Sequence, residues 1–240
     1  FLEWLKQQIR QHEIDVLLIA GDVFDSPNPS AESQRVYYRF LREVTSENPS
    51  LQIVIIAGNH DSAARLEAPN PLLEDMNIIV RGTVRRNAEG DIDLQHFIVP
   101  LYTEGKVTAY CLAVPYLRQG DYPSAENYSK GVQQLYEQLF NKVKEKGIPV
   151  VAMGHLQATG SEISEDDRSE RTVIGGLECV SPDAFNEAIT YTALGHLHRS
   201  QRVSHRENVR YSGTPMPMSF AEKNNASGVV MITIDTEGTN

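Results

Sequence analysis

Four short apolar runs in this chain each end at a glycine that is followed by Asp, Asn or His. Residues 15–20, 53–56, 149–153 and 189–194 lead into Gly21-Asp22, Gly58-Asn59-His60, Gly154-His155 and Gly195-His196-Leu197-His198. Short runs rich in β-branched residues predict strands buried on both faces. Ligands bind at the carboxyl ends of strands in open α/β sheets, so these polar residues are predicted to form a site. A polar turn explains each glycine singly, but not the fourfold recurrence.

Segments with helical spacing alternate with the first strands. Residues 1–12 place Leu2, Leu5 and Ile9 on one face. Ser30 is predicted to be the N-cap of a helix that runs to about Glu47. The core-facing stripe of that helix is predicted to be Val36, Tyr37, Phe40, Leu41 and Val44. The order helix, strand, helix, strand predicts parallel strands joined by crossover connections.

The rest of the chain predicts one large α/β domain spanning residues 1–240. Residues 63–77 read as a proline-broken, partly helical connection, and residues 129–146 as a second long helix. Further strands are predicted at residues 77–80, 94–101, 109–115, 209–213 and 228–235. Residues 157–171 form an acidic polar loop that either is simply solvated or has a gating or interface role.

Composition limits the possible classes of protein. With 240 residues, 40% of them hydrophobic, the chain is long enough for a substantial core. It has neither an apolar run of about eighteen residues for a membrane span nor a secretory segment. Cys111 and Cys179 lie in apolar segments and are predicted to be buried, reduced thiols, which favours a cytoplasmic location. The net charge of −10 argues against a nucleic-acid partner, although two divalent cations would offset it locally.

The side chains at the strand ends are oxygen and nitrogen donors, with no cysteine among them. This set suits Mn, Fe, Zn or Mg rather than a thiolate zinc site. A lone histidine is more often packed or exposed than a ligand, and His12, His96 and His205 fall in that class. The ordered combination after successive strands is far more specific. The candidate metal ligands are Asp22, Asn59, His155, His196 and His198.

The motifs GDVFDSPNPS, IIAGNHDS, MGHLQATGSE, ALGHLHRSQ and YSGTPMPMSFAE resemble those of the calcineurin-like metallophosphoesterases. The resemblance covers nearly the whole chain and implies a layered sandwich of two mixed β-sheets flanked by helices. It implies two divalent metal ions, with Mn²⁺ favoured, that Asp22 would bridge. Asn59, His155 and His196 would complete the coordination of one ion, and His198 would be a ligand of the other. His60 would act on the phosphate and on the leaving group.

Two aspartates have roles that the resemblance leaves open. Asp25 lies three residues beyond Asp22 and is predicted to hold His60 in the right tautomer, as the third member of a catalytic triad holds its histidine. The alternative for Asp25 is a helix N-cap or a loop acceptor. Asp61 is predicted to be an acceptor that stabilises the turn.

The chain departs from the family pattern at its start. Members of the family open with an Asp-x-His motif on a strand before the first helix, and this motif is not found here. We therefore expect a core that lacks its first strand, and also a C-terminal cap and partner-binding segment. One metal site would then be short of two ligands, and this chain would bind manganese weakly.

The substrate is a separate question. The sequence after His155 and after His198 resembles the DNA nucleases of the family, which work with an ATPase partner subunit as a homodimer in DNA repair and recombination. The alternatives are another phosphoesterase, acting on nucleotides, cyclic nucleotides or phosphoproteins, and a non-catalytic scaffold with a decayed site. His60 and the ligand set are intact, which argues against decay. A metal-dependent DNA nuclease is the preferred hypothesis.

Overall fold

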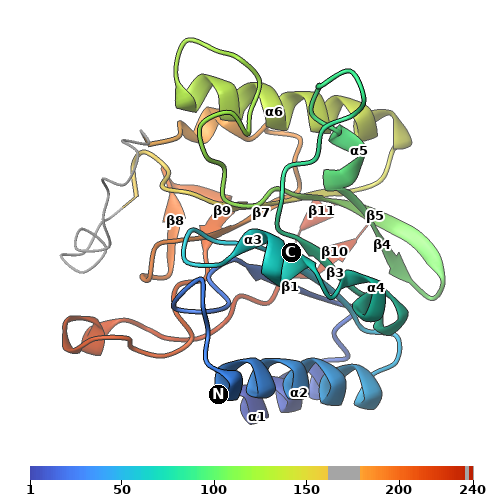
Figure 1. The fold of residues 1–240 in the computed structure, drawn as a ribbon, viewed down its shortest axis with the longest axis vertical. Coiled ribbons are helices and arrows are strands. Elements are labelled where there is room, and N and C mark those ends of the chain that lie inside the picture. Colours follow the sequence, from blue (N-terminus) through green and yellow to red (C-terminus); the bar gives the residue numbers. More distant parts are fainter. Residues whose placement is uncertain (162–178, 236–237, 240) are drawn as a thin grey trace.

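The computed structural model describes residues 1–161, 179–235 and 238–239, and most of the predicted acidic loop lies outside these residues. The chain forms an α/β sandwich in layers (Figure 1). Helices α1 (Leu2–Gln11) and α2 (Ala31–Glu47) lie along the bottom of the view, and α6 (Tyr128–Val143) lies along the top. Two sheets fill the space between them. The predicted α/β sandwich is confirmed.

The smaller sheet contains β1 (Val16–Ala20), β2 (Gln52–Ile56) and β3 (Ile78–Arg81), in the order β1-β2-β3. The prediction was that both sheets are mixed, but both pairings in this sheet are parallel. The strands are parallel because a helical connection between each pair returns the chain to the same end of the sheet. These connections are α2 between the first two strands, and then α3 (Ala63–Glu67), α4 (Asn70–Leu73) and η1 (Glu74–Met76).

The larger sheet is mixed, as predicted. Its central strands are parallel, and antiparallel strands pair at both edges. In spatial order the strands are β4 (Ile98–Thr103), β5 (Lys106–Ala113), β6 (Val150–His155), β7 (Tyr191–Gly195), β9 (Arg206–Tyr211) and β8 (Gln201–Val203). Short helices η2 (Lys144–Lys146), η3 (Pro182–Ala184) and η4 (Phe220–Asn224) lie in the connections.

Strand β2 is buried along its whole length because both of its faces are covered. Ile53 and Ile55 pack in the core that α1 and α2 cover, and Val54 and Ile56 pack against the larger sheet. Successive side chains of a strand point to opposite faces, so an unbroken apolar run fits this position. The Gln52 amide joins the two sheets by donating to the Pro100 carbonyl at 3.0 Å and accepting from the Tyr102 amide at 3.2 Å.

The helix predictions hold with one exception. The Ser30 hydroxyl accepts from the Ser33 amide at 3.0 Å, which confirms it as the N-cap of α2. Four of the five residues in the predicted stripe are buried, but Val36 is 41% exposed. Val36 lies at the edge of the stripe, where the helix surface turns toward solvent.

Two strand predictions are wrong in part. Residues 94–97 form the short helix α5 (Leu94–Phe97), and the strand starts only at Ile98. The Asp93 carboxylate accepts from the Gln95 amide at 3.1 Å, and this cap favours a helical turn over an extended start. Residues 228–233 are not in a strand, and β10 (Ile234–Asp235) pairs with β11 (Gly238–Thr239).

Both cysteines are free thiols, but only Cys111 is buried. Cys179 is exposed, contrary to the prediction. Its neighbour Val180 is buried and bridges to Ala158. In extended backbone, consecutive side chains face opposite sides, so Cys179 faces solvent. Within the described ranges, no helix has the length and apolarity that crossing a bilayer would require.

Candidate metal centre

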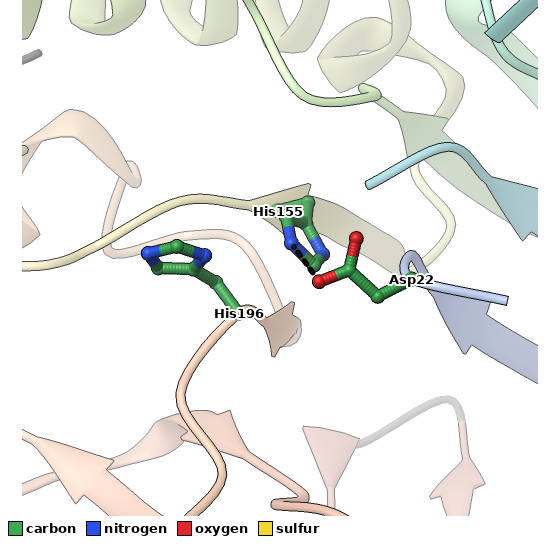
Figure 2. A group of neighbouring side chains, drawn as sticks. All are labelled: Asp22, His155 and His196. Carbon is green, nitrogen blue, oxygen red and sulfur yellow. Dashed lines mark ion pairs between the residues drawn. The ribbon is translucent and has the colours of Figure 1, made fainter. Parts of the chain in front are cut away.

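The predicted ligands lie at the carboxyl ends of strands from both sheets. Asp22 follows β1, Asn59 follows β2, His155 ends β6 and His196 follows β7. Ligand atoms of Asp22, His155 and His196 all lie within 4.8 Å of one another. Figure 2 shows these three side chains coming from separate segments, with the ion pair between His155 and Asp22 dashed. The two sheets therefore bring distant parts of the chain to one point.

The surroundings of His155 fix which of its nitrogens faces the cluster. Nδ1 lies 2.8 Å from the Ala20 carbonyl oxygen, which can only accept, so Nδ1 carries a hydrogen and donates it. Nε2 faces Asp22 Oδ2 at 3.1 Å and Asn59 Oδ1 at 2.9 Å. A nitrogen lone pair that faces two oxygens at these distances is favourable only with a proton or a cation between them. Asp22 and His155, together with His196, therefore form a candidate metal site.

His196 extends the cluster on its other side. Its Nδ1 lies 3.1 Å from Asn59 Oδ1, and its ring centroid lies 5.3 Å from that of His155. The backbone of His196 has φ +101°, and that of Asp22 has φ +48°. Positive φ is costly for residues with a Cβ, and such strain is concentrated at functional sites. Two of the clustered residues thus hold conformations that packing alone would not favour.

The Asp22 carboxylate is kept ionised by its neighbours. Burial raises its pKa, but the hydrogen bond and charge of His155 when a proton occupies its Nε2, aided by the His60 amide, outweigh that effect and lower the pKa to about 2. The His60 amide donates to Asp22 Oδ1 at 3.0 Å, while Oδ2 faces His155. Each oxygen of Asp22 therefore has a different neighbour, which suits a carboxylate proposed to bridge two ions.

Two glycines let the backbone approach these side chains. A Cβ on Gly58 would collide with the carboxylate and amide of Asp22, and a Cβ on Gly195 would collide with the Ala20 carbonyl. Glycine is therefore needed at both positions, because any side chain there would displace Asp22 or the Ala20 carbonyl.

Asp61 joins the two loops that hold Asp22 and Asn59. It is 2% exposed, and its carboxylate accepts from the amides of Gly58 at 2.8 Å, Phe24 at 3.0 Å and Val23 at 3.2 Å. Burial raises the pKa of Asp61, although these hydrogen bonds act in the opposite direction. The predicted role as a turn-stabilising acceptor is confirmed, and it extends across both loops.

His60 contacts Asp25, but not through the Asp25 carboxylate. His60 Nδ1 lies 3.0 Å from the main-chain oxygen of Asp25. A carbonyl accepts only, so Nδ1 again carries a hydrogen, and the lone pair of the neutral ring is on Nε2. The prediction that Asp25 orients His60 therefore needs correction, because the orienting oxygen belongs to the backbone and any residue would supply it.

His198 has a different neighbour, Glu222. Among the residues that the structure describes, the group whose ligand atoms lie within 4.8 Å of one another contains Asp22, His155 and His196 but not His198. His198 Nδ1 contacts Glu222 Oε1 at 2.6 Å. Sequence reasoning did not select Glu222, although a lone acid within the apolar segment 214–222 was a usable signal. The remaining histidines match expectation, since His12 and His205 are exposed and His96 is buried elsewhere.

A second missed feature lies beside His155. The ring of Tyr116 packs edge-on against His155, with centroids 6.2 Å apart, and the Arg118 guanidinium lies 5.6 Å from the Tyr116 ring centroid. The Tyr116 amide donates to the Ala57 carbonyl at 2.9 Å, which fixes this segment against the end of β2. No strand-end pattern marked these residues, because they follow β5 without a glycine.

Comparison with known proteins agrees with this geometry. Residues 1–200 match the family model described as calcineurin-like phosphoesterase. The chain is similar to the D subunit of the SbcCD nuclease from Rhodobacter capsulatus, with 39% identity over 97% of this chain and 60% of the relative. It is also similar to the proteins of the same name from Escherichia coli K12, at 30% over 97% and 58%, and Bacillus subtilis, at 28% over 96% and 59%.

The chain thus spans about three fifths of the length of these curated relatives. The family match covers residues 1–200 and so includes all of the clustered side chains and His198. The strand-end motifs, the layered sheets and the family match point to the same conclusion. The chain belongs to the calcineurin-like phosphoesterase family.

Proposed function

We propose that this protein is a metal-dependent DNA nuclease of the SbcD type, which hydrolyses phosphodiester bonds with two divalent cations. The observation that carries the proposal is the convergence of the His155 lone pair with the oxygens of Asp22 and Asn59. The relatives, each named as the D subunit of the SbcCD nuclease, supply the substrate class. Oxygen and imidazole donors suit hard-to-borderline cations, and we propose manganese.

We propose that Asp22 bridges the two cations, that Asn59, His155 and His196 complete the site of one, and that His198 serves the other. Two cations bound there would polarise the phosphate and activate a water for in-line attack. Asp22 is suited to the bridge because it stays ionised. Asn59 contributes a neutral oxygen, which leaves net positive charge at the site for a phosphate.

His60 is proposed to donate the proton to the leaving oxygen. Its Nδ1 hydrogen is held by the Asp25 main-chain oxygen, so the second proton of the imidazolium is on Nε2. The His60 amide also contacts Asp22. His60 follows Asn59 directly in the same loop. This connection keeps the general acid at a fixed position relative to the proposed metal ligand.

The proposal extends to partners and setting. The name SbcCD implies that the relatives act in a complex, and we propose that this protein binds DNA and an SbcC-like ATPase partner and works as a homodimer. We propose a cytoplasmic role in DNA repair and recombination, without membrane association. Residues 1–240 are proposed to act as one nuclease domain.

The test is a comparison of substrates in Mn²⁺ with the full-length protein. Linear double-stranded DNA, a nucleoside monophosphate, a cyclic nucleotide and a phosphopeptide are offered separately, with and without a chelator. We expect Mn²⁺-dependent cleavage of DNA, lost in Asp22→Asn and retained in the exposed control Asp75→Asn. Hydrolysis of the other substrates without DNA cleavage would indicate a different phosphoesterase. Bound Mn²⁺ with no hydrolysis of any substrate would indicate a scaffold.

A further inference from the structure

Glu222 is a buried acid whose two oxygens have different partners. It is 2% exposed. Its Oε1 lies 2.6 Å from His198 Nδ1, and its Oε2 accepts from the Met218 amide at 2.7 Å. The second contact spans four residues and is local, whereas the contact with His198 spans 24 residues. A carboxylate is costly to bury unless it is fully hydrogen-bonded, so both contacts are needed to hold it there.

The contact with Glu222 sets the state of the His198 ring. A carboxylate oxygen at hydrogen-bond distance from Nδ1 keeps a hydrogen on that nitrogen, and the lone pair of the neutral ring is then on Nε2. An imidazole that binds a cation through one nitrogen usually donates its other N–H to a carboxylate or carbonyl. His155 has the same arrangement, with the Ala20 carbonyl as its acceptor.

We propose that Glu222 is a positioning residue that fixes the tautomer and orientation of His198, so that His198 Nε2 binds the second cation. The inference rests on the proposed metal site and adds a residue to it. The acid also connects the segment from Thr214 to Asn224 to the centre. In this segment Met216, Met218 and Phe220 are exposed. The Glu222 carboxylate and the Thr214 amide, which donates to the His198 carbonyl at 2.9 Å, both connect it to His198.

A purely structural role for Glu222 makes a different prediction. If the acid only stabilised the turn through the Met218 amide, its replacement would lower the free energy of unfolding without changing the His198 ring. A positioning role requires that the His198 tautomer and the affinity for cation change as well. The two roles are therefore separated by measurements on the ring and on the metal, in addition to stability.

The experiment uses the full-length protein and the variants Glu222→Ala and Glu222→Gln. Gln keeps the size of Glu, but one of its two terminal atoms is an amide nitrogen that donates, so it cannot replace both acceptor oxygens, one facing His198 and the other facing the Met218 amide. Glu137→Gln, at an exposed position on α6, is the matched control. Nitrogen-15 NMR of labelled histidine in chelator reports the protonated nitrogen of His198, and calorimetric titration with Mn²⁺ alone reports affinity.

We expect His198 to carry its proton on Nδ1 in the unmodified protein and to change its spectrum in both Glu222 variants. Mn²⁺ affinity should fall by about 10- to 100-fold in Glu222→Ala, the range typical of removing such a partner, and by less in Glu222→Gln. Glu137→Gln should match the unmodified protein. Urea unfolding in chelator identifies any variant that fails to fold, and Glu222→Gln then carries the test.

Two results would overturn the inference, and they are distinguishable from failure of the proposed function. A His198 spectrum or an Mn²⁺ affinity unchanged in folded Glu222 variants would reduce the acid to a turn-stabilising role. Unchanged Mn²⁺ affinity in Asp22→Asn and His155→Ala would instead show that the metal site itself is wrong. The two Asp22 and His155 variants are therefore titrated alongside.

Discussion

His155 Nε2 lies 2.9 Å from Asn59 Oδ1, although the two residues are 96 positions apart in the chain. They meet because β2 and β6 belong to different sheets whose carboxyl ends come together at this point. Each residue is also held by an independent contact. The Ala20 carbonyl fixes the His155 ring, and Asp61 fixes the Gly58 amide just before Asn59. The pair is thus preorganised from both sides.

This pairing predicts strong coupling in Mn²⁺ binding. Asn59→Ala and His155→Ala should each weaken Mn²⁺ affinity by at least about tenfold, because each removes a ligand to the same ion. The double variant should lose much less than the product of the two single losses, since residues that share one partner are not additive. Calorimetric titration of the four proteins gives the coupling. Losses that simply multiply would place the two side chains on different ions, and His205→Ala, at an exposed position, is the control.

The sequence marked the side chains that cluster at the strand ends better than it marked the edges of the fold. Strand ends that carry glycine and a polar residue mark the positions of Asp22, Asn59, His155 and His196, because the pattern reflects buried strands and close backbone approach. That information is local, so it appears in the sequence. That the ends of β2 and β6 lie side by side depends on the tertiary structure. In the sequence, only the recurrence of the motif suggested it.

The errors arise where a contact is not encoded by side-chain type. Asp25 holds His60 through a main-chain oxygen, which the identity of residue 25 does not reveal. Leu94–Phe97 is helical because Asp93 caps it, although its residues also fit a strand. Glu222 was missed because its partner His198 lies 24 residues earlier and the intervening segment has no periodic pattern.

His60 provides a prediction about chemistry without metal binding. His60→Ala should lower kcat for DNA cleavage by about 10²- to 10⁴-fold, the usual contribution of a general acid, and should leave Mn²⁺ affinity unchanged. Asp25→Ala should leave kcat nearly unchanged, because the oxygen of Asp25 that faces His60 Nδ1 belongs to the backbone. Cleavage kinetics and Mn²⁺ titration measure both. Lost Mn²⁺ binding in His60→Ala would show that His60 is a ligand, and a severe defect in Asp25→Ala would restore a role for its carboxylate.

Replacing His196 by glycine is predicted to weaken metal binding but to relieve backbone strain. Its φ of +101° is strained for any residue with a Cβ. His196→Gly and His196→Ala should both lose Mn²⁺ affinity, because both remove the imidazole. In chelator, the Gly variant should have a free energy of unfolding about 1 kcal/mol higher than the Ala variant, since only glycine adopts this backbone without strain. Urea unfolding decides, and equal stability of the two variants would argue against strain at this residue.

Arg118 is predicted to contact DNA phosphate. It is exposed, and it stacks over Tyr116, whose ring packs on His155. Arg118→Ala should weaken DNA binding in chelator and should reduce the slope of log affinity against log salt by about 1, as expected for one lost phosphate contact. Arg118→Lys should keep the slope, because it keeps the charge. Fluorescence anisotropy at several salt concentrations measures both, with Arg42→Ala on the outer helix α2 as the control. An unchanged slope in Arg118→Ala would show that Arg118 does not contact a DNA phosphate.

His96 is predicted to make the protein less stable in mild acid. It is buried, and its Nε2 lies 3.6 Å from Glu67 Oε1. Burial, together with the charges of Arg81 and Arg85, lowers the pKa of His96 to about 4 from 6.5, although Glu67 and Asp93 act in the opposite direction. The unfolded chain therefore binds this proton more readily than the folded chain between those values. The contribution of His96 to stability is complete above pH 6.5 and is lost as the pH falls toward 4.

The comparison that isolates this effect is unmodified protein against His96→Leu, by urea unfolding between pH 7.5 and 4.5. Burial raises the pKa of Glu67, but its bonds to Thr83 and Arg85 outweigh burial and lower that pKa in the folded state, so its own contribution is lost only below its unfolded pKa of 4.5. Within this window, the stability difference between the two proteins should shrink or reverse as pH falls, because only the unmodified protein carries the titrating ring. His12→Gln, at an exposed histidine, should follow the unmodified protein at every pH. Parallel curves for His96→Leu and the unmodified protein would mean that His96 titrates alike in both states.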